Sequence, residues 1–245
     1  MFDSKFEAVL ADNALARRIH YRLRYRVYCL ETGFEDPGRF PDGEETDEFD
    51  RQAVHFLVRM KESGEWIAVM RLVSPQAGVL PMEGACRIDP DVKQRYFSEG
   101  VVEVSRLAMV ETFRRRSPDL RTLCEYQCDD GGHPPTLPVL VERRREPEVL
   151  LGLLRAMIAH CRQAGTRHLL FLITPGLARV LRRLNIRLEV VGPPCQHRGL
   201  RYPYAADVEE VYWSLTSVSP VVATMVQRAQ AYQSFSHLAL AAAKL

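Results

Sequence analysis

The chain has 245 residues, 47% hydrophobic and 26% charged, which is enough for one large globular domain and short for two. No apolar run reaches the ~18 residues of a membrane span and the N-terminus lacks a signal pattern, so we expect a cytoplasmic protein without a transmembrane segment. The net charge of +2 hides segregation: residues 31–50 carry nine acidic side chains and one Arg, whereas residues 143–187 carry ten Arg and two Glu.

Cysteine spacing gives no sign of a disulfide framework, so free thiols are expected in a reducing compartment. The six positions are Cys29, Cys86, Cys124, Cys128, Cys161 and Cys195. Cys124 and Cys128 with His133 allow a zinc interpretation, but the spacing fits no standard zinc finger and a fourth ligand is not evident. We therefore predict no bound metal.

Residues 5–32 are predicted to be helical, because apolar residues recur mostly at three- and four-residue intervals and Gly33 follows as a stop. The acidic stretch from Glu35 to Asp50 is rich in Pro and Gly, which predicts a loop. A solvated acidic loop is one interpretation. The other is a lid over a pocket, held by the upstream arginines Arg22, Arg24 and Arg26.

Residues 53–60 and 66–73 are rich in β-forming residues and are joined by Lys61-Glu62-Ser63-Gly64-Glu65, which predicts an antiparallel hairpin. Arg71 lies inside the second strand. A buried arginine at this position needs a partner or a ligand, because an unpaired buried charge is too costly to persist.

Residues 101–109 alternate apolar and polar side chains, which predicts a half-buried strand. Glu103 and Arg106 would face opposite sides of a regular strand, so a shared cleft requires a bulge between them. Such a bulge would place a base, a cation and free backbone amides together, with Ser105 between them. The alternative is a core strand whose Glu and Arg pair with neighbouring residues.

The second half alternates helices and strands, which indicates an α/β fold. An irregular insertion at 114–146 is followed by an expected helix at 147–165, a strand at 168–173 and a helix at 175–184. Strands are expected at 187–191 and 208–215 with a loop at 192–203 between them. Residues 1–218 would then form one domain, and Ser219-Pro220 would begin a C-terminal amphipathic helix over 219–245.

Several local patterns occur in the same order as in a known family. They are Leu23-Arg24-x-x-Val27-Tyr28, Gly33-Phe34, Asp47-x-x-Asp50, Arg71-Leu72 and Glu103-Val104-Ser105-Arg106. In these the chain resembles the acyl-homoserine-lactone (autoinducer) synthases and the N-acyl amino acid synthases of the GNAT superfamily. Tyr28-Cys29-x-Glu31 and Glu103 to Ala108 are most similar to the acyltransferases associated with the PEP-CTERM/exosortase system.

The resemblance implies a GNAT-like α/β fold, in which a mixed central sheet is flanked by helices, with a long insertion after the central strand and a C-terminal helix. It also implies site residues. Glu103 would be the general base, with Arg71, Ser105 and Arg106 beside it, and an amino-acid carboxylate would bind Arg71 and Arg106. The substrate-binding residues would be Arg24, Tyr28, Phe34, Asp47 and Asp50.

The implied reaction moves a long-chain fatty acyl group from an acyl thioester to the amine of an amino acid or a similar small amine. No permanently bound cofactor is expected. The donor would be acyl carrier protein, or else acyl-CoA, because an acidic carrier needs a basic docking face. The residues assigned to that face are Arg143, Arg144, Arg145, Arg179, Arg182 and Arg183.

Other functions remain open at this stage. Phe34 and Leu107 stand where lactone synthases usually have Trp and Phe, which favours amide formation over autoinducer synthesis. A non-catalytic module that binds acyl carrier protein or lipid would keep the arginine surface without requiring Glu103. A nucleic-acid binder is disfavoured, because the acidic loop opposes it and no aromatic-basic interleaving is present.

Overall fold

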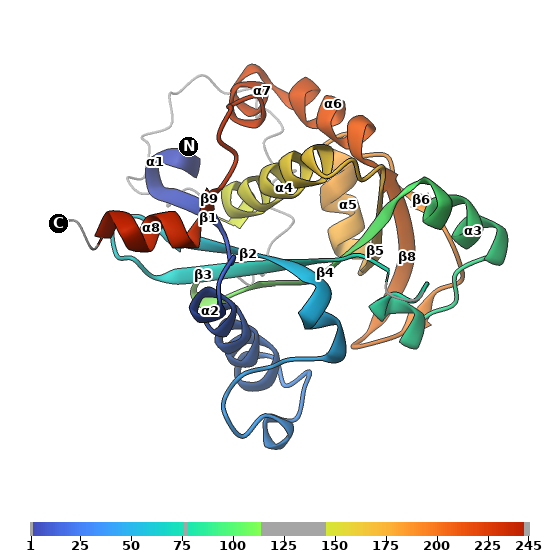
Figure 1. The fold of residues 1–245 in the computed structure, drawn as a ribbon. Helices are drawn as coiled ribbons and strands as arrows, with labels where there is room; N and C mark the ends of the chain where they lie inside the picture. The colour runs from blue at the N-terminus through green and yellow to red at the C-terminus, as the bar shows by residue number, and fades with distance from the viewer. Residues whose placement is uncertain (1, 76–77, 114–145, 243–245) are drawn as a thin grey trace, which may run out of the picture.

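A mixed β-sheet forms the centre of the computed structural model, which describes residues 2–75, 78–113 and 146–242 (Figure 1). Its strands are β1 (Phe6–Leu10), β2 (Ala53–Met60), β3 (Trp66–Val73), β4 (Val101–Met109), β5 (His168–Ile173), β6 (Glu189–Val190), β7 (Cys195–Gln196), β8 (Leu200–Asp207) and β9 (Gln233–Ser234). They are ordered β6-β8-β5-β4-β3-β2-β1-β9, with β7 beside β8. The helices are α1 (Phe2–Lys5), α2 (Ala14–Tyr25), α3 (Pro90–Glu99), α4 (Glu146–Gln163), α5 (Pro175–Arg183), α6 (Val208–Val218), α7 (Pro220–Val226) and α8 (Phe235–Ala242).

The strand directions change at the centre of the sheet. In strands β1 to β4 each strand is antiparallel to its neighbour, whereas β4 and β5 are parallel and β5 and β8 are antiparallel. A parallel pair needs a crossover connection, and α4 lies in that connection. This arrangement is the GNAT-like α/β fold that the sequence predicts.

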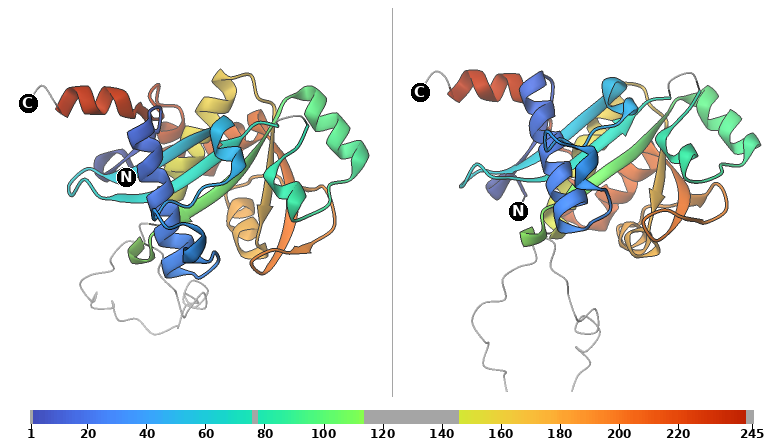
Figure 2. Two further views of the ribbon diagram at one scale, coloured as in Figure 1. Left: turned by 60° about the horizontal axis from the view of Figure 1, so that its bottom comes forward. Right: turned by 90° about the horizontal axis from the view of Figure 1, so that it is seen from below.

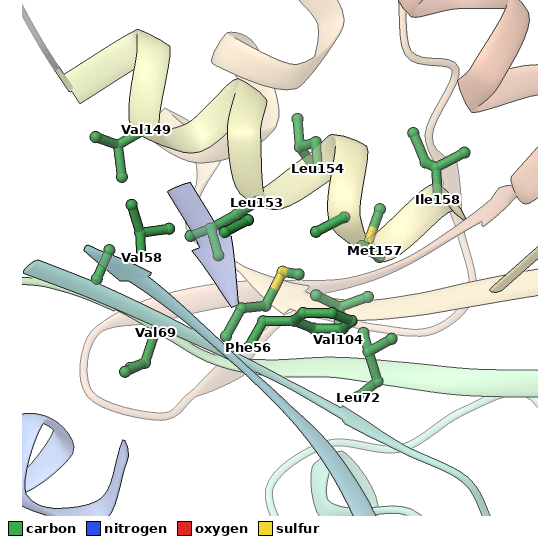
Figure 3. Packing of buried hydrophobic residues seen from close by; sticks show 14 of the residues in the cluster. Phe56, Val58, Val69, Leu72, Val104, Val149, Leu153, Leu154, Met157 and Ile158 are labelled. Atoms are coloured by element: carbon green, nitrogen blue, oxygen red, sulfur yellow. The ribbon is translucent and has the colours of Figure 1, made fainter. Parts of the chain in front are cut away.

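Helices cover both faces of the sheet. Helix α4 packs on one face against β1, β2 and β3, and α2 packs on the other face against β2 and β3 (Figures 1 and 2). Figure 2 also shows α8 and α3 at opposite ends of the sheet. Figure 3 shows side chains of α4 such as Leu153 and Met157 meeting Phe56 and Val104 of the sheet in the main core. Burial of this apolar surface is the chief source of stability for such a layered domain.

A second, smaller core lies under the segment from Leu80 to Tyr96. Leu80, Met82 and Tyr96 pack there against Val101 of β4 and Leu170 of β5. A short 3₁₀ turn, Pro81–Gly84, therefore lies beside β4.

The sheet and the central helix agree with the sequence predictions. The hairpin at 53–60 and 66–73, the strands at 101–109 and 168–173, and the helix at 175–184 are confirmed within one residue at each end. The helix predicted at 147–165 is α4. The insertion predicted at 114–146 lies outside the described residues, apart from Glu146 at the start of α4.

The prediction of one helix over residues 5–32 is wrong at its start. Phe6–Leu10 forms strand β1, which pairs with β2 and β9, and α2 begins only at Ala14 after the N-cap Asn13. The strand is buried on both faces, so its apolar residues give no alternation that distinguishes it from a buried helix. A π-helix over Arg26–Glu31 then leads to Gly33, whose φ of 63° ends the helical run.

Two predictions near the C-terminus are also wrong. Residues 208–215 are helical in α6, with Asp207 as N-cap, and the neighbouring strand β8 begins at Leu200 inside the stretch 192–203 that was predicted as loop. Strand β8 was not recognised in the sequence because it contains Pro203, and a proline inside a run of residues argues against a strand. Residues 219–245 contain α7, β9 and α8 rather than one helix, although Ser219 does cap α7.

Other features can be placed within the described residues. Cys29, Cys86, Cys161 and Cys195 are free thiols. The zinc candidates Cys124, Cys128 and His133 lie outside these residues, and the described part of the chain contains no group of ligands arranged for a metal ion. Within the same part, no helix combines the length and apolarity needed to cross a membrane.

Candidate active site

A cavity opens where β4 and β5 separate. Their parallel pairing ends at Val104 and Phe171. Beyond that point a cavity of about 350 Å³ is lined by β4 residues from Glu103 to Met109 and by Leu172 and Ile173 of β5. Among the described residues β4 and β5 do not pair beyond that point, so backbone amides of β4 that face β5 in this stretch can donate hydrogen bonds to a ligand.

The β4 strand carries the bulge that a cleft shared by Glu103 and Arg106 requires. Arg71 of β3 pairs with Ser105 and Val69 pairs with Ala108, so β4 contains one extra residue between these pairs. Arg106 lies in this bulge with a φ of 51°, a left-handed conformation that is costly for a residue with a side chain. The bulge brings Arg106 onto the same cavity as Glu103 and Ser105.

Glu103 is a buried carboxyl group at the cavity wall, with 3% of its surface exposed. Its Oε2 accepts a hydrogen bond from the backbone N–H of Met82 at 2.8 Å. Burial raises the pKa of Glu103 to about 7, although the Met82 N–H and the positive charges of Arg71 and Arg106 act in the opposite direction. Near neutral pH this carboxyl can therefore both accept and release a proton.

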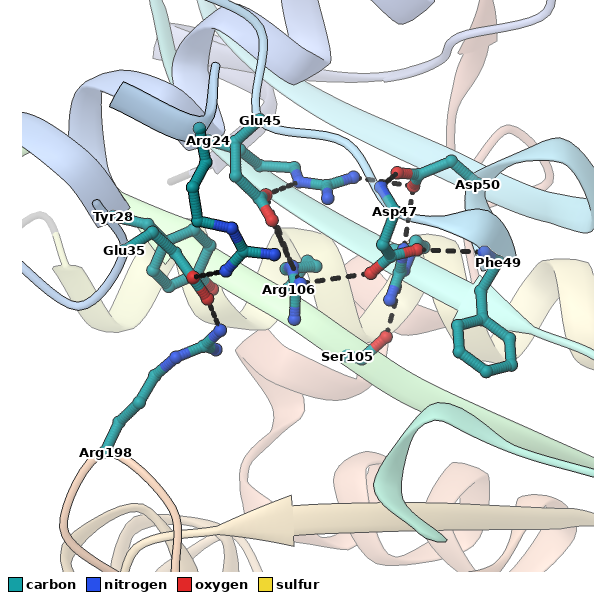
Figure 4. Close-up of polar contacts among 12 residues, drawn as sticks. Arg24, Tyr28, Glu35, Glu45, Asp47, Phe49, Asp50, Ser105, Arg106 and Arg198 are labelled. Carbon is teal, nitrogen blue, oxygen red and sulfur yellow. Dashed lines mark hydrogen bonds and ion pairs between the residues drawn. The ribbon is translucent and has the colours of Figure 1, made fainter. Parts of the chain in front are cut away.

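Three arginines and three carboxylates form a network on the side of the cavity next to α2 (Figure 4). Arg24 donates from Nε to Glu45 and from Nη1 to Asp50 Oδ1 at 2.6 Å. Arg71 donates from Nη1 to Asp47 Oδ1 at 2.6 Å and to Asp50 Oδ1 at 2.8 Å. Both guanidinium groups are fully buried, so these carboxylates supply the compensating charge.

Arg106 completes the network. Figure 4 shows its guanidinium between Glu45 and Asp47, with Nη2 at 2.9 Å from Glu45 Oε1 and 3.0 Å from Asp47 Oδ2. Ser105 Oγ accepts from Arg71 Nε at 3.1 Å. The three positive and three negative charges of the network balance, and Arg106 in the bulge is held by Glu45 and Asp47.

This pairing argues against the prediction that Arg71 and Arg106 bind the acceptor carboxylate. Arg71 is fully buried and bonded to Asp47 and Asp50, and Arg106 is bonded to Glu45 and Asp47. A substrate carboxylate would have to displace one of these internal partners, which would leave a buried charge unpaired.

The acidic loop is fastened to α2 by two of the three arginines that the lid interpretation names. Arg24 binds Asp50 and Glu45, and Arg22 binds Glu44. Arg26 pairs with Glu31 and Glu65 outside the loop. Glu45 was not predicted from the sequence, because it is one of several acidic residues in an irregular loop. Only the fold shows that it pairs with Arg24 and Arg106.

Asp50 is the most heavily bonded carboxylate of the network. It also accepts a hydrogen bond from His55 Nε2 at 3.1 Å, and its other oxygen accepts from the backbone N–H of Asp47 at 2.8 Å. Burial would raise the pKa of Asp50, but the His55 hydrogen bond and the charges of Arg24 and Arg71 hold it far below its usual range. Asp50 therefore remains ionised.

Aromatic side chains form another wall of the cavity. Tyr28 is buried, donates from its hydroxyl to the backbone oxygen of Leu107 at 3.2 Å, and lies 6.5 Å from the ring of Phe34. The guanidinium carbons of Arg106 and Arg198 lie 5.7 and 5.5 Å from the centre of the Tyr28 ring. The predicted substrate-binding residues Tyr28, Phe34 and Asp47 thus line the cavity, whereas Arg24 and Asp50 lie behind it.

The hairpin between β7 and β8 also reaches the cavity, with His197, Arg198 and Arg201. These residues were missed, since the sequence around them reads as a loop and the arginines carry no distinguishing motif. Arg198 binds Glu35 of the acidic loop (Figure 4). The two loops therefore contact each other at the cavity entrance.

Of the arginines predicted to dock a carrier protein, three can be placed. Arg179, Arg182 and Arg183 are exposed on α5, and the same helix contributes Leu177 to the cavity. Arg143, Arg144 and Arg145 lie outside the described residues. Arg155 of α4 is buried against Asp3 and adds nothing to a basic surface.

Comparison with known protein families agrees with the fold. Residues 23–123 match the sequence profile of the family described as "Acetyltransferase (GNAT) domain". The matched stretch contains the last residues of α2, the acidic loop and strands β2 to β4, which carry the network and Glu103. A search of curated proteins gave no match.

Three solved structures illustrate the similarity in fold. The CoA-dependent acyl-homoserine lactone synthase BjaI, with SAM and isopentyl-CoA, has a TM-score of 0.57 at 16% identity over 94% of this chain and 92% of its own. TofI, in a ternary complex with an inhibitor and MTA, has a TM-score of 0.56 at 17% identity over 88% of this chain and 99% of its own. FeeM, an N-acyl amino acid synthase from uncultured soil microbes, has a TM-score of 0.52 at 14% identity over 85% of this chain and 94% of its own.

Proposed function

We propose that this protein, whose fold is that of the GNAT acyltransferases, is an N-acyltransferase that makes N-acyl amino acids. It would move a long-chain fatty acyl group from an acyl thioester to the amine of an amino acid or a similar small amine. The observation that carries the proposal is the position of Glu103. This buried carboxyl, with a pKa of about 7, lines a cavity beside unpaired β4 amides and a bulge.

The chemistry needs a base and an oxyanion site. Glu103, ionised above about pH 7, takes a proton from the acceptor ammonium directly or through a water. The amine nitrogen then attacks the thioester carbonyl carbon, and the backbone amides of β4 donate to the oxyanion. Collapse of the tetrahedral intermediate breaks the carbon–sulfur bond, and the proton held by Glu103 neutralises the departing thiolate. The attacking nitrogen releases its second excess proton to solvent, which leaves the neutral amide.

The shape of the cavity suits an acyl chain. Its volume lies within the range of small-molecule sites, and apolar side chains form much of its wall. Those that contribute include Val27, Met82, Leu107, Met109, Leu172 and Leu177. The network of Arg24, Arg71 and Arg106 with its carboxylates then acts as a frame that fixes the bulge rather than as a substrate clamp.

Analysis of cellular lipids tests the proposal. Cells that express the chain should accumulate N-acyl amino acids, detected by mass spectrometry of lipid extracts, and cells that express Glu103→Gln should not. Acyl-homoserine lactones in place of acyl amino acids would indicate an autoinducer synthase. Bound thioester or lipid without any new product would indicate a binding module instead.

Acyl carrier protein is the proposed donor, in the cytoplasm, and exposed arginines on α5 support it. Arg179, Arg182 and Arg183 have no carboxylate partner among the residues that the structure describes. The neighbour BjaI is described as CoA-dependent, so acyl-CoA is the competing donor. The resemblance to exosortase-associated acyltransferases rests on the sequence motifs.

Charge reversal of α5 should separate these donors. The double variant Arg182→Glu and Arg183→Glu should lower kcat/KM for acyl carrier protein by about 10-fold or more at low salt, because basic residues steer the encounter with an acidic protein. The loss should shrink as ionic strength rises. Stopped-flow or steady-state kinetics over a salt series measures both effects.

A small acyl thioester of N-acetylcysteamine provides the control, because it needs no docking face and should be used almost as before. Reversal of Arg162 of α4, which pairs with Glu209 of α6, is the surface control variant. Carrier-protein kinetics that stay unchanged at low salt would place docking elsewhere. Faster turnover of coenzyme A thioesters than of carrier-protein thioesters would reject the proposed donor.

A further inference from the structure

The cavity contains three arginines, and two of them are engaged by the protein itself. Arg106 is bonded to Glu45 and Asp47, and Arg198 is bonded to Glu35. Each of these guanidinium groups has its charge compensated before any ligand arrives. The third arginine, Arg201, differs from both.

Arg201 has no carboxylate within ion-pair distance among residues 2–75, 78–113 and 146–242. Its Nε donates to the backbone oxygen of His197 at 2.6 Å, and no acceptor in the same ranges bonds its two terminal nitrogens. The side chain is half-buried at the cavity wall. Arg201 therefore presents two parallel N–H donors to a ligand, which is the fork that binds a carboxylate with two hydrogen bonds.

The hairpin that carries Arg201 is a tight one. Cys195 pairs with Arg201 and Gln196 with Leu200, and the turn between them is closed by a hydrogen bond from His197 N–H to Gly199 O at 3.0 Å. Arg198 and Gly199 both have positive φ, at 52° and 92°. The short turn and the bond from Arg201 to His197 fix the guanidinium before a ligand binds, which lowers the entropic cost of binding.

The charges around the cavity leave room for one anion. The six-residue network is balanced, Arg198 is balanced by Glu35, and burial together with the charge of Arg201 lowers the pKa of His197, which favours its neutral form. Glu48 is exposed at the rim, and the negative charge that Glu103 acquires above about pH 7 is available to an ammonium group in the same cavity. Arg201 contributes a positive charge that no ion pair among the described residues compensates.

We infer that Arg201 binds the carboxylate of the acceptor, so that the enzyme selects amino acids over simple amines. This inference rests on the proposed function and assigns its acceptor class to one residue. The acceptor would be held by its carboxylate at Arg201 while its amine faces Glu103 across the same cavity. A phosphate of the donor's pantetheine arm is the other anion that such a fork can bind.

Acceptor kinetics of Arg201→Met test the inference. With a dodecanoyl thioester of N-acetylcysteamine, which carries no phosphate, the proteinogenic L-amino acids are each compared with their primary amides. The wild type should prefer the best amino acid over its amide by about 10²-fold in kcat/KM. In Arg201→Met the KM for the acid should rise by about the same factor, with little change in kcat and in the kinetics of the amide.

Two further variants sharpen the result. Arg201→Lys keeps the charge but loses the fork, so it should restore only part of the preference for the acid. Arg187→Met removes an exposed arginine near β6 and should leave the preference intact. Unchanged preference in Arg201→Met would overturn the inference. So would a rise in KM only for phosphopantetheine thioesters, which would assign Arg201 to the donor.

A binding measurement does not depend on turnover. Calorimetry should show N-dodecanoyl amino acid binding the wild type at least about 10-fold more tightly than its carboxamide, with the difference lost in Arg201→Met. Equal affinities of the wild type for the two compounds would reject the role of Arg201. Absence of acylation of every amine, together with a retained preference for the acid, would instead reject the proposed function and keep the site.

Discussion

Replacement of Glu103 by Gln is expected to lower turnover by about 10²- to 10⁴-fold, because general-base catalysis contributes that much where a carboxylate is correctly placed. Gln keeps the size of Glu and can accept the Met82 N–H hydrogen bond, so the fold should survive. Single-turnover kinetics with a small acyl thioester would measure the chemical step. The wild-type rate should rise with pH up to about 7, where Glu103 ionises, and the variant should lack this dependence.

The matched control is Glu83→Gln. Glu83 lies close to Glu103 in the fold but bonds Lys93 and the backbone of Leu80 on the outer side of the 3₁₀ turn. Its replacement should change turnover by less than a few-fold. A Glu103→Gln variant as active as the wild type would remove Glu103 from the mechanism.

The Glu103→Gln variant should also be more stable than the wild type at alkaline pH. The pKa of Glu103 is about 7 in the folded protein against about 4.5 for an exposed group, so folding favours its protonated form. This contribution to stability is fully present below pH 4.5 and is lost as the pH rises through 7. At pH 8 the Glu103→Gln variant should gain up to about 3 kcal/mol in free energy of unfolding, and it should gain little at pH 4.5. Urea unfolding at both pH values measures the difference.

Asp50→Ala is expected to destabilise the protein by about 3–5 kcal/mol, because it leaves Arg24 and Arg71 buried with too little compensating charge. Urea or thermal unfolding at pH 7 would measure it. Activity should fall as well, since Arg71 holds Ser105 and the bulge. Because the pKa of Asp50 is depressed, its contribution is present above its unfolded pKa near 4 and is lost progressively as the pH falls below that value.

Glu44→Ala is the control from the same acidic loop. Glu44 binds Arg18 and Arg22, whose side chains are 57% and 59% exposed, and exposed ion pairs contribute less than about 1 kcal/mol. A loss for Asp50→Ala no larger than that for Glu44→Ala would mean that the network does not support the fold. Together the two variants separate a buried charge frame from ordinary surface pairing.

The sequence predicted those parts of the fold in which local pattern and tertiary environment agree. The hairpin of β2 and β3 has a clear turn between two β-rich runs, and β4 alternates as a half-buried strand should. The bulge was expected only if Glu103 and Arg106 serve one cleft, and a core strand whose Glu and Arg pair with neighbouring residues was the alternative. The structure contains the bulge, and it also pairs Arg106 with Glu45 and Asp47.

The sequence predictions failed where tertiary contacts determine the secondary structure or the pairing of a charge. Phe6–Leu10 is buried on both faces, so its sequence resembles a buried helix as much as a strand. Val208, Val211 and Leu215 have helical spacing, but the β-branched side chains of Val208 and Val211 favoured a strand. Glu45 and Arg201 belong to irregular segments, where only the folded chain reveals which charge is compensated and which is not.

The pairing of β9 with β1 has a consequence for synthesis. Asp12, just after β1, accepts hydrogen bonds from Ser234 and Ser236, and Ser234 lies 222 residues later in the chain. During translation the outer edge of β1 therefore emerges long before the strand that covers it. Until then that edge presents unpaired backbone groups to other nascent chains, so chaperone protection of the N-terminal strand should matter from its emergence until residues 233–234 are synthesised.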